Sequence, residues 1–160
     1  MNNQKFRISR MVSPSTMLLG ALVSLGALVT VSPVHAGVSC HLINAKAVGQ
    51  DNGGGSTTAR VIGGGLLHGT IAGSLTITGV SGTVASFVET VTFTNEHGTL
   101  TAVITGAFDL VSGQFNASGP VTAATGKLSG ASGNISVSGV AHSGIFTEDI
   151  TGDVCVDLAP

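Results

Sequence analysis

The feature that most constrains this chain is a two-residue alternation of apolar and polar side chains, interrupted at intervals by glycine. It is clearest between Gly113 and Gly139, where the alternating segments 114–123 and 134–141 flank a glycine-rich corner at 125–133. A period of two is typical of strands with one buried face. Glycines in the corner allow the backbone conformations of a tight turn. The stretch therefore predicts an antiparallel hairpin at the centre of an all-β fold.

The same alternation recurs along the chain, with turn-forming residues between the segments. It predicts about eight strands, at residues 38–48, 57–62, 70–78, 83–94, 99–110, 114–123, 134–141 and 144–158. The glycine-rich segment 49–56 is predicted to be an irregular loop. This spacing favours an antiparallel eight-stranded β-barrel with meander topology. A sandwich of two packed sheets is one alternative fold, and a β-helix is another, because segments such as 76–79 resemble its short repeats.

The N-terminus has the pattern of a signal peptide. Three basic residues precede an apolar run over residues 17–31, and the residues up to Ala36 match a small-residue cleavage site. We expect cleavage before Gly37, which separates a signal peptide helix over residues 1–36 from a β-barrel domain over residues 37–160. The apolar run has 15 residues, fewer than the about 20 of a membrane span. No membrane span is therefore expected in the mature form; an uncleaved anchor is the alternative.

Two cysteines, Cys40 and Cys155, lie near the two ends of the mature chain. In an oxidising compartment they are expected to form a disulfide, which would stabilise the fold by about 4–5 kcal/mol in the chain-entropy model. Two unpaired thiols are one alternative, and a lipid attached to Cys40 is another. The signal peptide and the disulfide together predict an exported protein, located in the periplasm or outside the cell.

Composition excludes several classes of function. The mature chain keeps three of the six Lys and Arg residues and all eight Asp and Glu residues, so its net charge is −5. This charge does not favour nucleic acid or an anionic membrane surface as a partner. The chain contains no Tyr or Trp, so it lacks the aromatic girdles of an outer-membrane barrel. No cluster of His and Cys and no cofactor motif is present, and we expect neither a metal nor a cofactor.

Two glutamates stand on otherwise apolar strand faces. In segment 83–95 the apolar odd positions include Phe87 and Phe93, and Glu89 lies between them; Glu148 has apolar neighbours in the same way in the last segment. Burial raises the pKa of such a carboxyl, which suits ligand binding or proton transfer. A hydrated position near a barrel mouth is the alternative for both. The candidate pocket residues are Phe87, Glu89, Phe93, Glu148 and, as a counter-charge to a buried glutamate or as a plain surface residue, Arg60.

The corner sequence TGKLSGASG at residues 125–133 resembles the T-G-[KR]-x-x-G-A-x-G corner of the allene oxide cyclase and dirigent-like barrel superfamily. Segments 92–100 and 108–119 are similar to that family as well, and Leu128 departs from it where an aromatic residue is usual. The resemblance implies an eight-stranded antiparallel barrel, often trimeric, whose lumen holds an apolar small molecule. The family's catalytic residues are not transferred, because the dirigent constellation needs a tyrosine that this chain lacks.

Two functional classes follow. The first is a non-catalytic exported barrel that binds a small apolar ligand or serves as an envelope or extracellular component. The second, which the resemblance implies, is a cyclase- or isomerase-like enzyme that acts on an apolar molecule in the lumen. We favour the first, because the few charged residues barely furnish a catalytic site. An open lumen cavity of about 300 Å³ or more, lined by Phe87, Phe93 and Glu89, would favour binding or catalysis, and a lumen filled by side chains would favour a structural role.

Overall fold

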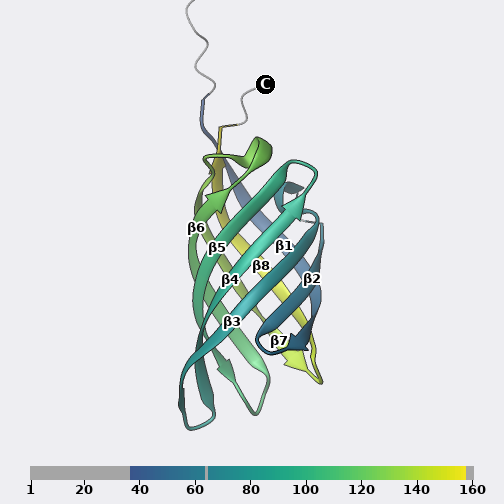
Figure 1. Cartoon of the computed structure of the whole chain (residues 1–160), viewed down its shortest axis with the longest axis vertical. Helices are drawn as coiled ribbons and strands as arrows, with labels where there is room; N and C mark the ends of the chain where they lie inside the picture. Colours follow the sequence, from purple (N-terminus) through teal and green to yellow (C-terminus); the bar gives the residue numbers. More distant parts are fainter. Residues whose placement is uncertain (1–36, 64, 158–160) are drawn as a thin grey trace, which may run out of the picture. The chain divides into compact units, whose positions relative to one another are not determined.

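Eight antiparallel strands close into a barrel in the computed structural model, which describes residues 37–63 and 65–157 (Figure 1). Each strand pairs with its neighbours in sequence, and the last pairs back with the first. The predicted antiparallel eight-stranded barrel is thereby confirmed, and the signal peptide predicted over residues 1–36 lies outside the described residues. The strands are β1 (Ser39–Gly53), β2 (Ser56–Ile62), β3 (Thr70–Ser81), β4 (Val84–Asn95), β5 (Gly98–Asp109), β6 (Gln114–Ala124), β7 (Ser132–His142) and β8 (Ile145–Val156).

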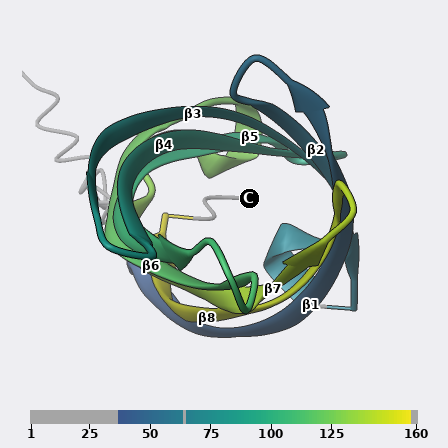
Figure 2. The same ribbon diagram turned by 90° about the horizontal axis from the view of Figure 1, so that it is seen from below.

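Alternate residues of each strand face the lumen, as the two-residue period predicts. In β4 the odd positions are inward, and Ala85, Phe87, Val91 and Phe93 are buried there. In β8 the even positions are inward and include the fully buried Ile150. The core is thus a column of aliphatic and phenyl side chains enclosed by the ring of strands that Figure 2 shows end-on.

One end of the barrel is plugged. Two short 3-10 turns, η1 (Gly65–Leu67) and η2 (Gly126–Leu128), connect strands there and bury the side chains of Leu67 and Leu128. In η2 the backbone N–H of Lys127 donates to the carbonyl oxygen of His97 at 2.7 Å. Gly126 has a φ of +63° and approaches the same carbonyl, a position that a side chain would obstruct. The glycine-rich corner identified in the sequence therefore forms one half of the plug, and η1 forms the other.

The opposite end, which we call the mouth, carries the turns between β1 and β2, β3 and β4, β5 and β6, and β7 and β8. It is the lower end in Figure 1. The predicted irregular loop at 49–56 is wrong, because β1 continues to Gly53 and pairs Asp51 with Thr57 of β2. The reason is that Gly53, Gly54 and Gly55 all take positive φ, which compresses the reversal into a tight turn.

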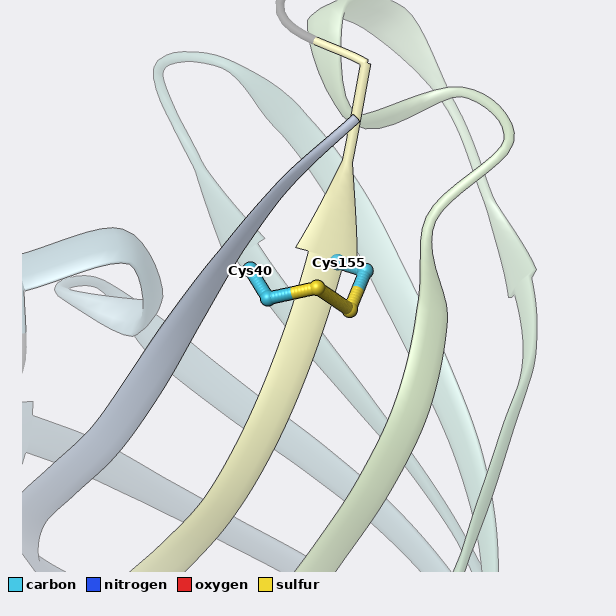
Figure 3. Close-up of a disulfide and its surroundings, with 2 residues drawn as sticks. All are labelled: Cys40 and Cys155. Atoms are coloured by element: carbon cyan, nitrogen blue, oxygen red, sulfur yellow. A yellow bond between two sulfur atoms is a disulfide. The ribbon is translucent and has the colours of Figure 1, made fainter. Parts of the chain in front are cut away.

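The barrel closes along the seam between β1 and β8. Cys40 and Cys155 are direct partners in this ladder and form a disulfide across it (Figure 3). The bond joins residues 115 positions apart in the chain. The predicted disulfide is confirmed. Among the residues that the structure describes, no helix has the length and apolarity that crossing a membrane requires.

Candidate functional site

The lumen near the mouth contains a cavity of about 270 Å³. Most of its lining is aliphatic or aromatic. Asp51, Ile77 and Leu110 also line it and are themselves exposed, so the cavity reaches solvent at the mouth. Its volume lies just below the range of about 300–1,000 Å³ that is usual for small-molecule sites. The volume is thus slightly below the about 300 Å³ expected for a binding or catalytic lumen.

Phenyl rings line this part of the lumen because glycines on neighbouring strands make room for them. Phe115 pairs with Gly139 and Phe146 pairs with Gly49. A Cβ at Gly139 would lie 2.7 Å from Cζ of Phe115, and a Cβ at Gly49 would overlap the ring of Phe146. The rings of Phe115 and Phe108 stack at 6.5 Å, and Phe146 meets Phe115 edge-on at 6.3 Å. The cavity thus has a mutually packed aromatic wall.

Two glutamates enter this apolar space from opposite sides of the barrel. Glu89 is on β4 and Glu148 is on β8, which lie four strands apart in either direction around the ring (Figure 2). Both strands begin at the mouth, and on each a cavity phenylalanine precedes the glutamate by two residues, as Phe87 and Phe146. The two strands therefore present the same order of side chains, first a ring and then a carboxyl, along the path inward.

Glu89 is held by a hydroxyl on β2. Thr57 donates from Oγ1 to Oε1 of Glu89 at 2.8 Å. Burial raises the pKa of Glu89, and the hydrogen bond from Thr57 partly offsets that rise because it favours the ionised carboxylate. Gly73 of β3 lies between the two strands, and a Cβ there would fall on both bonded oxygens. Glycine at this position is what allows the hydrogen bond.

Glu148 faces the lumen between Ala47 of β1 and Gly139 of β7. Burial raises its pKa to about 7, and the negative charge of Glu89 contributes to that rise. Since Thr57 stabilises the ionised form of Glu89 alone, we assign the first negative charge of the pair to Glu89. Glu148 then retains its proton up to neutral pH.

The structure brings together three of the five predicted pocket residues. Phe87, Glu89 and Glu148 line the cavity. Phe93 faces inward as predicted but is outside the cavity, because it packs at the plugged end, where its register partner is Leu100. Arg60 is exposed on the outer face of β2, so it is the plain surface residue of the two interpretations and not a counter-charge to a buried glutamate.

The sequence reasoning missed several cavity residues. Thr57 and the rings of Phe108 and Phe115 were not predicted to be pocket residues. Phe146 is a fourth cavity residue that was not predicted. The sequence did contain a signal for it, since Phe146-Thr147-Glu148 repeats the pattern Phe87-Val88-Glu89. For Thr57, Phe108 and Phe115, the side of the sheet and the level along the lumen follow from the strand pairing, which the local sequence does not reveal.

The chemistry of the site is that of a carboxyl pair in apolar surroundings. Among the described residues, no group of three or more His, Cys, Asp or Glu side chains has an arrangement that holds a metal ion. Comparisons of the chain with protein-family models, with curated proteins and with solved structures give no match. The resemblance to the allene oxide cyclase and dirigent-like superfamily stays a prediction, and the geometry of the cavity has to support a function by itself.

Proposed function

We propose that this protein is an exported, non-catalytic barrel that binds a small, mainly apolar ligand in the lumen near its mouth. The observation that carries the proposal is the cavity of about 270 Å³, which is open at one end and has two carboxyl groups in an otherwise apolar lining. A barrel with a purely structural role would fill this volume with side chains, since interior voids weaken packing. Here the cavity stays open although the rings of Phe146 and Phe115 already occupy the space beside Gly49 and Gly139.

Binding of an uncharged apolar dye tests the proposal. The chain has no Trp or Tyr, so the emission of prodan, a polarity-sensitive naphthalene dye, can be followed with little protein background. We expect a blue-shifted, saturable signal with the wild-type protein. Native mass spectrometry of the secreted protein would also detect a small molecule that co-purifies with it.

Two adjacent residues of β7 provide a matched pair of variants. Ala141 lines the cavity, whereas Val140 points outward and is exposed. Ala141→Phe should abolish the prodan signal because the new ring fills the lumen, and Val140→Phe should leave it unchanged. Absence of a saturable signal in the wild type, or equal loss in both variants, would contradict lumen binding and leave a structural role as an envelope or extracellular component.

A cyclase- or isomerase-like activity is the second candidate. The observation that favours it is the pKa of Glu148 at about 7, because a general acid or base works best when its pKa lies near the operating pH. Conversion of the co-purifying molecule, followed by mass spectrometry, would reveal turnover. If Glu148→Gln keeps the affinity for that molecule and loses its conversion, the protein is an enzyme; if the molecule is not converted by the wild type, binding is the function.

We also propose export to the periplasm or the medium and assembly into a homo-oligomer, a trimer by analogy with the resembled family. The outward residues of β3, β4 and β5 between Thr70 and Ala107 are Thr, Ser, Ala, Val and Gly, without a charged side chain. An uncharged wall of this kind suits contact between subunits better than an isolated surface, where mixed charges are usual. Native mass spectrometry of the secreted protein would report both the cleaved N-terminus and the number of subunits.

A further inference from the structure

The ionisable residues that line the cavity are all acidic. It includes Asp51 at the mouth and Glu89 and Glu148 in the lumen, and none of the described residues that line it is Lys, Arg or His. Basic side chains that are close in sequence to the lining residues are exposed on the outside of the wall: His142 on β7, Arg60 on β2, and Lys46, which is paired with Asp149. An anionic ligand would therefore find no partner in the lumen.

The two lumen glutamates repel each other. Their carboxyls share one apolar space, and two like charges in such a space are not both stable unless a proton or a cation lies with them. The charge of Glu89 acts on Glu148 across the lumen. The described parts of β3, β5 and β7 place no titratable side chain inward, and β1 contributes only Asp51 at the mouth and His41 at the plugged end. Among the described residues that line the cavity, no basic group is present to neutralise the pair.

Aromatic rings complete the lining around the carboxyls. Phe87 and Phe146 precede the glutamates on their own strands, and Phe108 and Phe115 pack beside Phe146. The face of a phenyl ring carries partial negative charge and attracts ammonium groups within about 6 Å of its centre. Carboxylates and phenyl rings around one small space are the two kinds of group that bind an organic cation in preference to a neutral molecule of the same shape.

We infer that the ligand of this lumen is an organic monocation, an ammonium group attached to a small apolar body. The inference rests on the proposed binding function and adds the charge of the ligand. The ammonium group lies between Glu89 and Glu148, where it replaces the proton that the pair otherwise retains. The apolar body packs against the rings and the aliphatic residues, including Ile77 and Leu110 toward the mouth. A bare inorganic cation lacks such a body and gains nothing from the apolar lining.

Three probes of equal length separate this inference from the proposed function. Hexylammonium, 1-hexanol and hexanoate share one alkyl chain and carry a positive, no and a negative charge. Displacement of prodan, or calorimetry, at about pH 8 should rank hexylammonium about tenfold or more above hexanol, with hexanoate weakest. Equal or tighter binding of hexanol would overturn the cationic ligand and leave apolar binding intact. Failure of all three probes, together with prodan, would overturn the binding function itself.

Neutral variants of the two lumen glutamates test whether they cause the preference for hexylammonium over hexanol. Glu89→Gln combined with Glu148→Gln should remove the preference for hexylammonium over hexanol, and circular dichroism checks that the variant is folded. Asp149→Asn changes the neighbouring carboxylate on the outer face of β8 and should leave the preference as in the wild type. A preference that survives in the double variant, or is lost in Asp149→Asn, would contradict the assignment of the ammonium group to the lumen pair.

The pH dependence provides a test on the unmodified protein. Hexylammonium stays protonated across this range, since an alkylammonium resembles the Lys side chain with its pKa of about 10.4. Its preference over hexanol should shrink by about tenfold between about pH 8 and about pH 5, because Glu148, with a pKa of about 7, gains a proton and the lumen loses one of its negative charges. A preference that is independent of pH would contradict the inference.

Discussion

Thr57 on β2 donates a hydrogen bond of 2.8 Å to Glu89 on β4, and the bond passes over the intervening strand β3. It is possible because position 73, directly beneath it, is glycine. Three adjacent strands therefore cooperate to hold one carboxylate in the lumen. The arrangement distinguishes the two glutamates of the cavity, since only Glu89 has such a donor among the described hydrogen bonds.

Removal of this donor should destabilise the protein. Thr57→Val keeps the shape of the side chain and loses the hydroxyl, so a buried carboxylate loses its partner; we expect a loss of about 1–3 kcal/mol in the free energy of unfolding at neutral pH. Chemical denaturation measures it. Thr76→Val, an exposed outward position on β3, is the control and should be nearly neutral. Equal effects of the two substitutions would show that the hydrogen bond contributes nothing.

The lumen glutamates predict an unusual dependence of stability on pH. The pKa of Glu148 in the folded protein is about 7, above its ordinary value of 4.5. The folded state therefore binds more protons than the unfolded state between these values, and stability falls as pH rises from about 4.5 to about 7. The pKa of Glu89 is raised too, which adds to the decline in the same direction.

Glu148→Gln should flatten this profile. Because glutamine stays neutral, the variant should be more stable than the wild type at about pH 8, by an amount of the order of 3 kcal/mol, and should match it at about pH 4. Thermal unfolding across the pH range measures the difference. Asp149→Asn serves as the outward-facing control and should keep the wild-type profile. A wild-type protein that gains stability from pH 5 to pH 7 would refute the raised pKa.

The disulfide should contribute strongly to stability, because it closes a loop spanning 115 residue positions. Replacing both Cys40 and Cys155 by Ser should lower the free energy of unfolding by about 4–5 kcal/mol in the chain-entropy model. Reversible denaturation of the variant, with the reduced wild type for comparison, measures the loss. A loss below about 1 kcal/mol would mean that the unfolded chain is already compact around this seam.

The plug should depend on its leucines. Leu128 is 1% exposed, and Leu128→Ala should reduce stability by about 2–5 kcal/mol, because it removes buried apolar contacts and leaves a void. Val111→Ala is the control: Val111 is 80% exposed in the turn between β5 and β6, and the substitution should change stability by less than about 0.5 kcal/mol. If the two variants are equally stable, η2 is not part of the core.

Sequence alternation predicted the wall of the barrel well. The strands fall within a few residues of the predicted segments except at the end of β1, and the odd face of β4 is inward as expected. This succeeded because inward and outward positions differ clearly in polarity there. In β2 the two faces do not differ in this way: Val61 is inward and Ile62 is outward. The local pattern therefore carried no information on the side that Arg60 occupies.

Depth along the lumen could not be predicted. A two-residue period identifies the face of a strand but not the level at which a side chain lies, so Phe87 in the cavity and Phe93 near the plug look equivalent in the sequence. Leu67 and Leu128 belong to short turns with no alternation, and nothing local marks them as buried. The packed end and the hollow end emerge only from the register of the closed sheet.

Because Leu67 and Leu128 plug one end, the described barrel is open at the mouth and is not a channel through the molecule. If the lumen binds a ligand as proposed, the ligand has to leave through the mouth by which it entered, because Leu67 and Leu128 are packed at the other end. The lifetime of a bound ligand then depends on the residues around the mouth, where Ile77 and Leu110 line the cavity and are exposed to solvent. A bulkier rim would slow loading and release together and leave the equilibrium affinity nearly the same.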